Sequence, residues 1–155
     1  MTDRREVWIT GVGLLTCLGE GLEAAWLALE RGDPPPYDDK TFAPNIVHPM
    51  RPMSFDKQIA KKSDQRQMET WQRVGVYAAG LALTEAGIAG NAELLDHTDM
   101  IISASGGERD IAVDTAILTG MRKAQHPGAF LNEHLMSDLR PTLFLAQLPN
   151  MLAGN

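Results

Sequence analysis

Cys17 is the only thiol among the 155 residues, so it is the first candidate for a catalytic nucleophile. A thiol becomes reactive when a neighbouring histidine, lysine or arginine favours its thiolate form. Residues 11–23 contain none of these three types. The sequence therefore predicts a small buried core residue at Cys17 rather than a nucleophile, and a lone cysteine cannot form an internal disulfide.

Histidine and acidic residues are the next candidates for metal binding or acid–base chemistry. The four histidines are His48, His97, His126 and His134. None stands at the i, i+2 or i, i+4 spacing that places two ligands on one metal, so the sequence predicts no metal site. Glu108 and Asp110 straddle a turn, where they are expected to favour the N-terminus of the following helix rather than to act as paired acid and base.

The glycines of Gly11-Val12-Gly13 follow an apolar run, an arrangement that suggests a dinucleotide-binding turn. Thr16, however, occupies the position of the third glycine in G-x-G-x-x-G, and no acidic residue ends a second strand about 20 residues later. We therefore favour a strand-to-loop turn and predict no cofactor. A nucleotide-binding α/β domain is kept as an alternative, which titration with a nicotinamide cofactor would test.

One segment departs from the acidic character of the chain, which carries 20 Asp and Glu against 14 Lys and Arg, a net charge of −6. Residues 56–73 hold five basic side chains and three acidic ones, a local charge of +2. Such a segment is usually a solvated helix face, and it would also suit docking of an acidic partner.

The overall charge and the lack of a long apolar run limit the classes of partner. A net charge of −6 would repel a polyanion, so no nucleic-acid partner is expected. No apolar run approaches the roughly 18 residues that span a bilayer, and the first residues lack the apolar stretch of a signal peptide. We expect a cytoplasmic protein without a membrane span.

The candidate residues named above would be positioned by strands and helices that alternate along the chain. Two apolar runs, 7–10 and 97–103, predict buried strands, and helical spacing predicts helices over 22–31, 64–86 and 110–123. Proline residues make about 33–57 an irregular excursion. The alternation predicts parallel strands with right-handed crossovers, hence an α/β layered fold. In the middle helix, small residues predict a face that another backbone approaches closely: Gly75, Ala78, Ala79, Ala82 and Ala86.

Two strands are too few for a self-sufficient parallel core, and the last fifteen residues stay apolar almost to their end. We therefore expect the chain to be the first part of a longer structure.

Four stretches resemble, in the right order, the β-ketoacyl-acyl-carrier-protein synthases of the elongating type II class. They are 7–19 (VWITGVGLLTCLG), 65–68 (QRQM), 101–107 (IISASGG) and 148–155 (LPNMLAGN). The resemblance implies a thiolase-like fold, which has five α-β-α-β-α layers in the complete family, and a homodimer. It also implies the decarboxylative condensation of an acyl thioester with malonyl-acyl-carrier protein, in fatty-acid or related lipid assembly.

The resemblance places no catalytic residue in this chain. The family's nucleophilic cysteine follows the segment that matches Met151 to Asn155, and its two histidines come later still. Cys17 matches a position where relatives commonly carry proline. The expectation is therefore a partial N-terminal domain, 1–155, truncated before the catalytic cysteine. The alternative is a non-catalytic pseudo-synthase that pairs with a complete partner and shapes its tunnel; the reading frame beyond Asn155 would distinguish the two.

Four residues match accessory positions of the family. Lys62 and Arg66 match basic residues that meet the acidic carrier protein, although Gln67 stands where many members have another cation. Gly106 matches a residue that gates the acyl pocket, and Leu143 matches one that reaches across the dimer to the partner's pocket. Because both pocket residues are small for their positions, the resemblance implies a long or roomy acyl tunnel.

Overall fold

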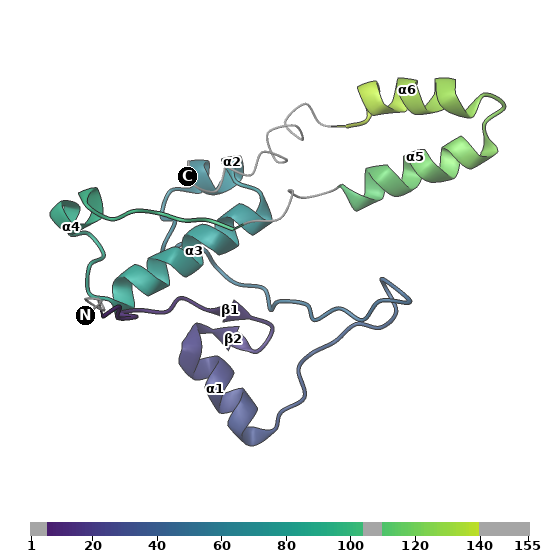
Figure 1. Ribbon diagram of the computed structural model, residues 1–155. Helices are drawn as coiled ribbons and strands as arrows, with labels where there is room; N and C mark the ends of the chain where they lie inside the picture. Colours follow the sequence, from purple (N-terminus) through teal and green to yellow (C-terminus); the bar gives the residue numbers. More distant parts are fainter. Residues whose placement is uncertain (1–5, 104–109, 140–155) are drawn as a thin grey trace, which may run out of the picture. The chain divides into compact units, whose positions relative to one another are not determined.

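The computed structural model describes residues 6–103 and 110–139. The chain divides into two compact units, Met1–Met68 with Arg73–Met100 and Glu69–Gln72 with Ile101–Asn155, which we call the first and second units. In chain order, the described elements are β1 (Leu15–Thr16), β2 (Gly19–Glu20), α1 (Gly21–Arg31), α2 (Lys62–Gln67), α3 (Thr70–Glu85), α4 (Ala92–Asp96), α5 (Ile111–Lys123) and α6 (Pro127–Ser137) (Figure 1).

The only sheet in the described ranges is a small hairpin. β1 and β2 pair antiparallel, with Leu15 opposite Glu20 and Thr16 opposite Gly19. The Thr16 hydroxyl accepts the Leu18 amide hydrogen at 3.1 Å, which closes the turn between them. Cys17 lies in this turn and is half-buried, so the prediction of a fully buried core position was wrong.

The two strands predicted over 7–10 and 97–103 do not form in the described part of the chain, so the predicted parallel pairing was wrong. Val7 is 92% exposed and Ile101 is 97% exposed. An apolar, β-branched run indicates that a segment can be buried, but a strand also requires a neighbour that satisfies its backbone hydrogen bonds. No described segment supplies that neighbour for either run.

The helix predicted over 22–31 is confirmed as α1. It ends at Gly32, whose φ of 66° lies in the left-handed region, and the Gly32 and Asp33 amides return to the carbonyls of Leu29 and Ala28. Of the apolar face predicted for this helix only Ala25 is buried, while Trp26 is 58% exposed.

The long helix predicted from Asp64 is divided into α2 and α3. Met68 is extended between them, with ψ of 138°, so it leaves the predicted helix face. The Gln72 side chain accepts the Glu69 amide hydrogen at 2.6 Å, which is half of a capping box and starts a new helix. The predicted stop is confirmed, because α3 ends before Gly87, whose φ is 73°.

The small-residue face of α3 packs against the segment before β1. A Cβ atom at Gly13 would fall 2.7 Å from the Ala78 carbonyl carbon, and one at Gly11 would fall 2.8 Å from the Ala86 nitrogen. Glu85 accepts the Val12 amide hydrogen at 2.5 Å. The predicted close backbone approach is therefore confirmed, although Ala79 is exposed and does not share this face.

The second unit contains a helical hairpin, in which α5 and α6 lie side by side (Figure 1). Asp110 caps α5, as predicted, by accepting the Val113 amide hydrogen at 3.2 Å. Gly120 makes room for the Phe130 ring, since a Cβ there would lie 2.7 Å from Phe130 Cε1. Helix α6 was not predicted, although Pro127 at its start was an available signal.

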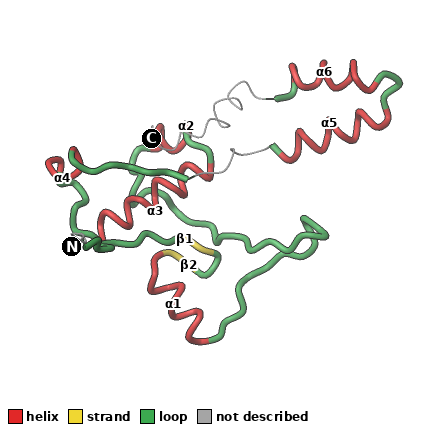
Figure 2. The backbone as a smooth tube through the Cα atoms, in the orientation of Figure 1, coloured by secondary structure: helices red, strands yellow, loops and turns green. Residues whose placement is uncertain are grey.

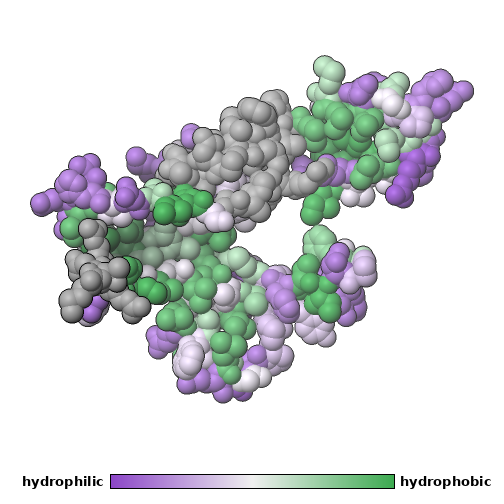
Figure 3. All heavy atoms as spheres, in the orientation of Figure 1, coloured by the Kyte–Doolittle hydropathy of each residue, from purple (hydrophilic) through white to green (hydrophobic). Residues whose placement is uncertain are grey.

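The remaining described segments are loops, which make up much of the first unit (Figure 2). Residues 33–57 contain no strand, and their only β-type pairing is the isolated antiparallel bridge between Asp38 and Val47. Hydrophobic side chains are visible on the surface of both units (Figure 3). No helix of the described residues is both long and apolar enough to cross a membrane.

We predict that Gly13→Ala lowers the free energy of unfolding by roughly 1–3 kcal/mol, because the new methyl group would overlap the backbone of α3. Urea unfolding followed by circular dichroism measures the change. Gly128→Ala is the matched control, since a Cβ at that helical glycine meets nothing within 4 Å, and we expect it to be neutral or slightly stabilising. Equal stability of wild type and Gly13→Ala would contradict the close approach.

Candidate functional site

Two of the four predicted site residues, Lys62 and Arg66, lie on α2. They are separated by four residues, so they share one face of this helix, and both are exposed. The structure thus brings together the two residues predicted for docking. Gly106 and Leu143, predicted for the acyl pocket, lie outside the described residues.

Lys62 forms an ion pair within the chain, with the carboxylate of Asp56. Asp56 also accepts a hydrogen bond from Gln65 Nε2 at 2.7 Å. Hydrogen bonds from Lys62, Gln65 and Ser54, in that order of effect, lower the pKa of the Asp56 carboxyl from 3.8 to about 2. The Lys62 charge is therefore partly compensated in this structure.

Gln65 fastens α2 to the turn that precedes it. Its buried side chain donates to the Ile59 carbonyl at 2.5 Å as well as to Asp56. Ile59 is itself buried, and its amide bonds to the Phe55 carbonyl. Neither Asp56 nor Gln65 was predicted to belong to the site, because in the sequence Asp56 is one negative charge of the basic segment and Gln65 is one residue of the QRQM stretch.

Lys57, the first cation of the basic segment, is also paired. Its Nζ lies 3.0 Å from Oε1 of Glu20, the residue that ends β2. This contact raises the pKa of Lys57 and, together with a hydrogen bond from Tyr77, lowers the pKa of Glu20. Burial raises the pKa of the Tyr77 hydroxyl, so Tyr77 serves as a hydrogen-bond donor to Glu20.

Arg73, the last cation of the segment, stands over an aromatic ring. Its guanidinium carbon lies 5.5 Å from the centre of the Phe55 ring, which meets Tyr77 edge-on at 5.9 Å. Of the five cations between 56 and 73, Lys61 and Arg66 alone form no ion pair or ring contact with any described residue. The charges of these two side chains are therefore not compensated by any described residue.

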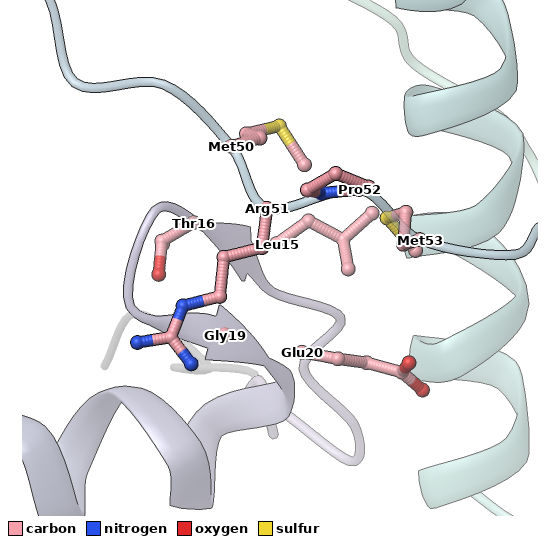
Figure 4. A pocket seen from close by; sticks show the side chains of 8 residues that line it. All are labelled: Leu15, Thr16, Gly19, Glu20, Met50, Arg51, Pro52 and Met53. Carbon is pink, nitrogen blue, oxygen red and sulfur yellow. The ribbon is translucent and has the colours of Figure 1, made fainter. Parts of the chain in front are cut away.

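A pocket of about 180 Å³ lies between the hairpin and residues 50–53 (Figure 4). Its lining residues are Leu15, Thr16, Gly19, Glu20, Met50, Arg51, Pro52 and Met53. Most of the lining is apolar, and Glu20 and Arg51 are the charged residues among those that line it. Cys17 does not line it.

The other motifs with possible chemistry have structural partners. Gly11 and Gly13 pack against α3, which explains these glycines without a nucleotide. His48 Nδ1 lies 2.9 Å from the Pro36 carbonyl, and His134 Nδ1 lies 2.7 Å from an Asp138 oxygen. Across residues 6–103 and 110–139, no three His, Cys, Asp or Glu side chains gather in a way that could hold a metal ion.

A family model described as "Beta-ketoacyl synthase, N-terminal domain" matches residues 4–155, which is nearly the whole chain. This match confirms the predicted family and the predicted fold class, the N-terminal portion of a thiolase-like α/β fold. A comparison with curated proteins gave no match.

We predict that Asp56 contributes a small, solvent-screened stability that disappears in acid. Because its folded pKa is lowered to about 2, the contribution is complete above about pH 4 and is lost as the pH falls through 2. The difference in free energy of unfolding between wild type and Asp56→Asn should therefore shrink between pH 4 and pH 2, measured by urea unfolding. A difference that stays constant over this range would contradict the lowered pKa.

Proposed function

The chain belongs to the β-ketoacyl synthase family, whose N-terminal domain it matches over residues 4–155, and we propose that it docks the carrier protein for an elongating synthase. The proposed enzyme is a 3-oxoacyl-[acyl-carrier-protein] synthase II that works as a homodimer. Membership in the family supports a condensing enzyme, a transferase of fatty-acid biosynthesis.

In the proposed reaction, an acyl chain passes from acyl carrier protein to an enzyme cysteine. Malonyl-carrier thioester then loses carbon dioxide, and the resulting carbanion attacks the acyl thioester carbonyl. The new carbon–carbon bond forms as the cysteine thiolate leaves, which gives a β-ketoacyl-carrier product. We assign Cys17 no part in this step, because it lies in the turn of the β1–β2 hairpin and does not line the pocket beside residues 50–53.

One observation carries the docking role: α2 presents Lys62 and Arg66 on one exposed face, within a basic segment of an otherwise acidic chain. Arg66 is exposed and unpaired among the described residues, so its charge is available to a partner. Long-range attraction between this face and an acidic carrier would speed their encounter. Outside residues 56–73 the chain carries 17 acidic against 9 basic side chains, so most of the remaining surface would attract an acidic carrier less.

A second candidate is a non-catalytic subunit that pairs with a complete synthase and shapes its tunnel. The hairpin position of Cys17 fits both candidates, since the family resemblance places the nucleophilic cysteine after the segment that matches Met151 to Asn155. The two candidates share the docking surface and differ in chemistry. Condensation assays on the product of the complete reading frame decide between them, because only the synthase forms β-ketoacyl product without an added partner.

We predict that Arg66→Gln weakens binding of holo acyl carrier protein by up to about fivefold, mainly through slower association. Surface plasmon resonance at low and high salt measures the rates, and the loss should shrink as salt screens the charges. Lys123→Gln at the end of α5 is the matched control with the same change in charge. Equal weakening by both variants would show that α2 is not the docking surface.

For the acyl pocket we propose that Gly106 and Leu143 leave a roomy tunnel, as the family resemblance implies. Gly106→Ile in the complete enzyme should shift the products towards shorter acyl chains, because the added side chain fills part of the channel. Chain-length profiling by mass spectrometry measures the shift. An unchanged profile would reject the assignment of Gly106 to the pocket.

A further inference from the structure

Building on the proposed docking role of α2, we infer that Asp56 is an internal counter-ion, which occupies Lys62 in the free protein and is displaced by an acidic carrier protein. Asp56 would then set the affinity of docking and its selectivity among acidic partners. It acts through Lys62 and is not itself a contact for the carrier.

The geometry makes this exchange possible because the ion pair is open to solvent. The side chain of Lys62 is 65% exposed and that of Asp56 is 52% exposed. A carboxylate or phosphate of a partner can therefore reach the Lys62 ammonium without any movement of the backbone. Exposed ion pairs are also weak, so the exchange of one acid for another costs little.

Gln65 gives Asp56 a second partner that stays in place when Lys62 leaves. The Gln65 amide is buried and donates to Asp56 at 2.7 Å and to the Ile59 carbonyl at 2.5 Å. The turn before α2 is thus held whether or not the ion pair is made. Displacement of Asp56 from Lys62 changes charge at the surface while it leaves the local fold intact.

The arrangement also discriminates among partners. Arg66 carries no ion pair among the described residues, so it attracts any acidic surface. Lys62 is available only to an acidic group that competes with Asp56, because two carboxylates beside one ammonium repel each other. A partner must place its acid at Lys62 while it contacts Arg66, four residues further along α2.

The test compares the binding of holo acyl carrier protein to the full chain and four variants by isothermal titration. Asp56→Asn removes the charge but keeps an oxygen that accepts from Gln65, so the turn should survive. Asp64→Asn is the matched control, because Asp64 is also exposed on α2 and its carboxylate accepts a hydrogen bond from the Ser63 hydroxyl rather than from Lys62. Lys62→Met and the double variant Asp56→Asn/Lys62→Met complete a cycle that isolates the coupling.

We expect Asp56→Asn to bind the carrier roughly two- to fivefold more tightly than wild type, with a smaller gain for Asp64→Asn. The gain should vanish when Lys62 is replaced. Carrier binding that is equal for wild type and Asp56→Asn, or a gain that persists without Lys62, would overturn the inference and leave the docking role standing. No binding to any of the five proteins would overturn the docking role itself, and the inference with it.

Discussion

The contact between two backbones, that of α3 and that of residues 11–13, is the constraint on which the first unit depends. It exists only because positions 11 and 13 are both glycine: a Cβ atom at Gly11 or Gly13 would overlap the backbone of α3. The contact fixes the segment that enters β1, and Glu85 adds a hydrogen bond to Val12. Since the same helix carries Tyr77, which bonds Glu20 and meets Phe55, it also anchors the hairpin and the loop that leads to α2.

The basic segment shows why a count of charges does not locate a binding surface. Two of its cations pair with acids of the chain, which partly compensates their charge, and the Arg73 guanidinium packs over the Phe55 ring. What remains for a partner is Lys61, Arg66 and the part of Lys62 that Asp56 leaves uncompensated. Exposed pairs of this kind contribute little to stability, which leaves them free to exchange partners.

Local signals in the sequence were sufficient for α1 and α5, because a glycine stop and an Asp cap act within one turn of the helix they bound. They failed for the strands over 7–10 and 97–103, since strand pairing depends on a distant neighbour. They also missed the break before α3, where a single side chain, Gln72, supplies the cap. For the site, the family resemblance pointed to Lys62 and Arg66. The roles of Asp56 and Gln65 became visible only in the structure, because they depend on contacts between residues that lie six to nine positions apart in the chain.

The features that most suggested chemistry and those that support function are therefore different residues. Gly11-Val12-Gly13 resembles a phosphate-binding turn, yet its glycines are explained by the packing of α3, and Cys17 by a hairpin turn. A glycine that a neighbouring backbone fills cannot also cradle a ligand, because the space is already taken. In the proposed docking, the carboxylate of Asp56, which looked like one charge among many, controls how much of the Lys62 charge a partner can use. Recognition at this surface would thus depend on which charges the fold has already neutralised.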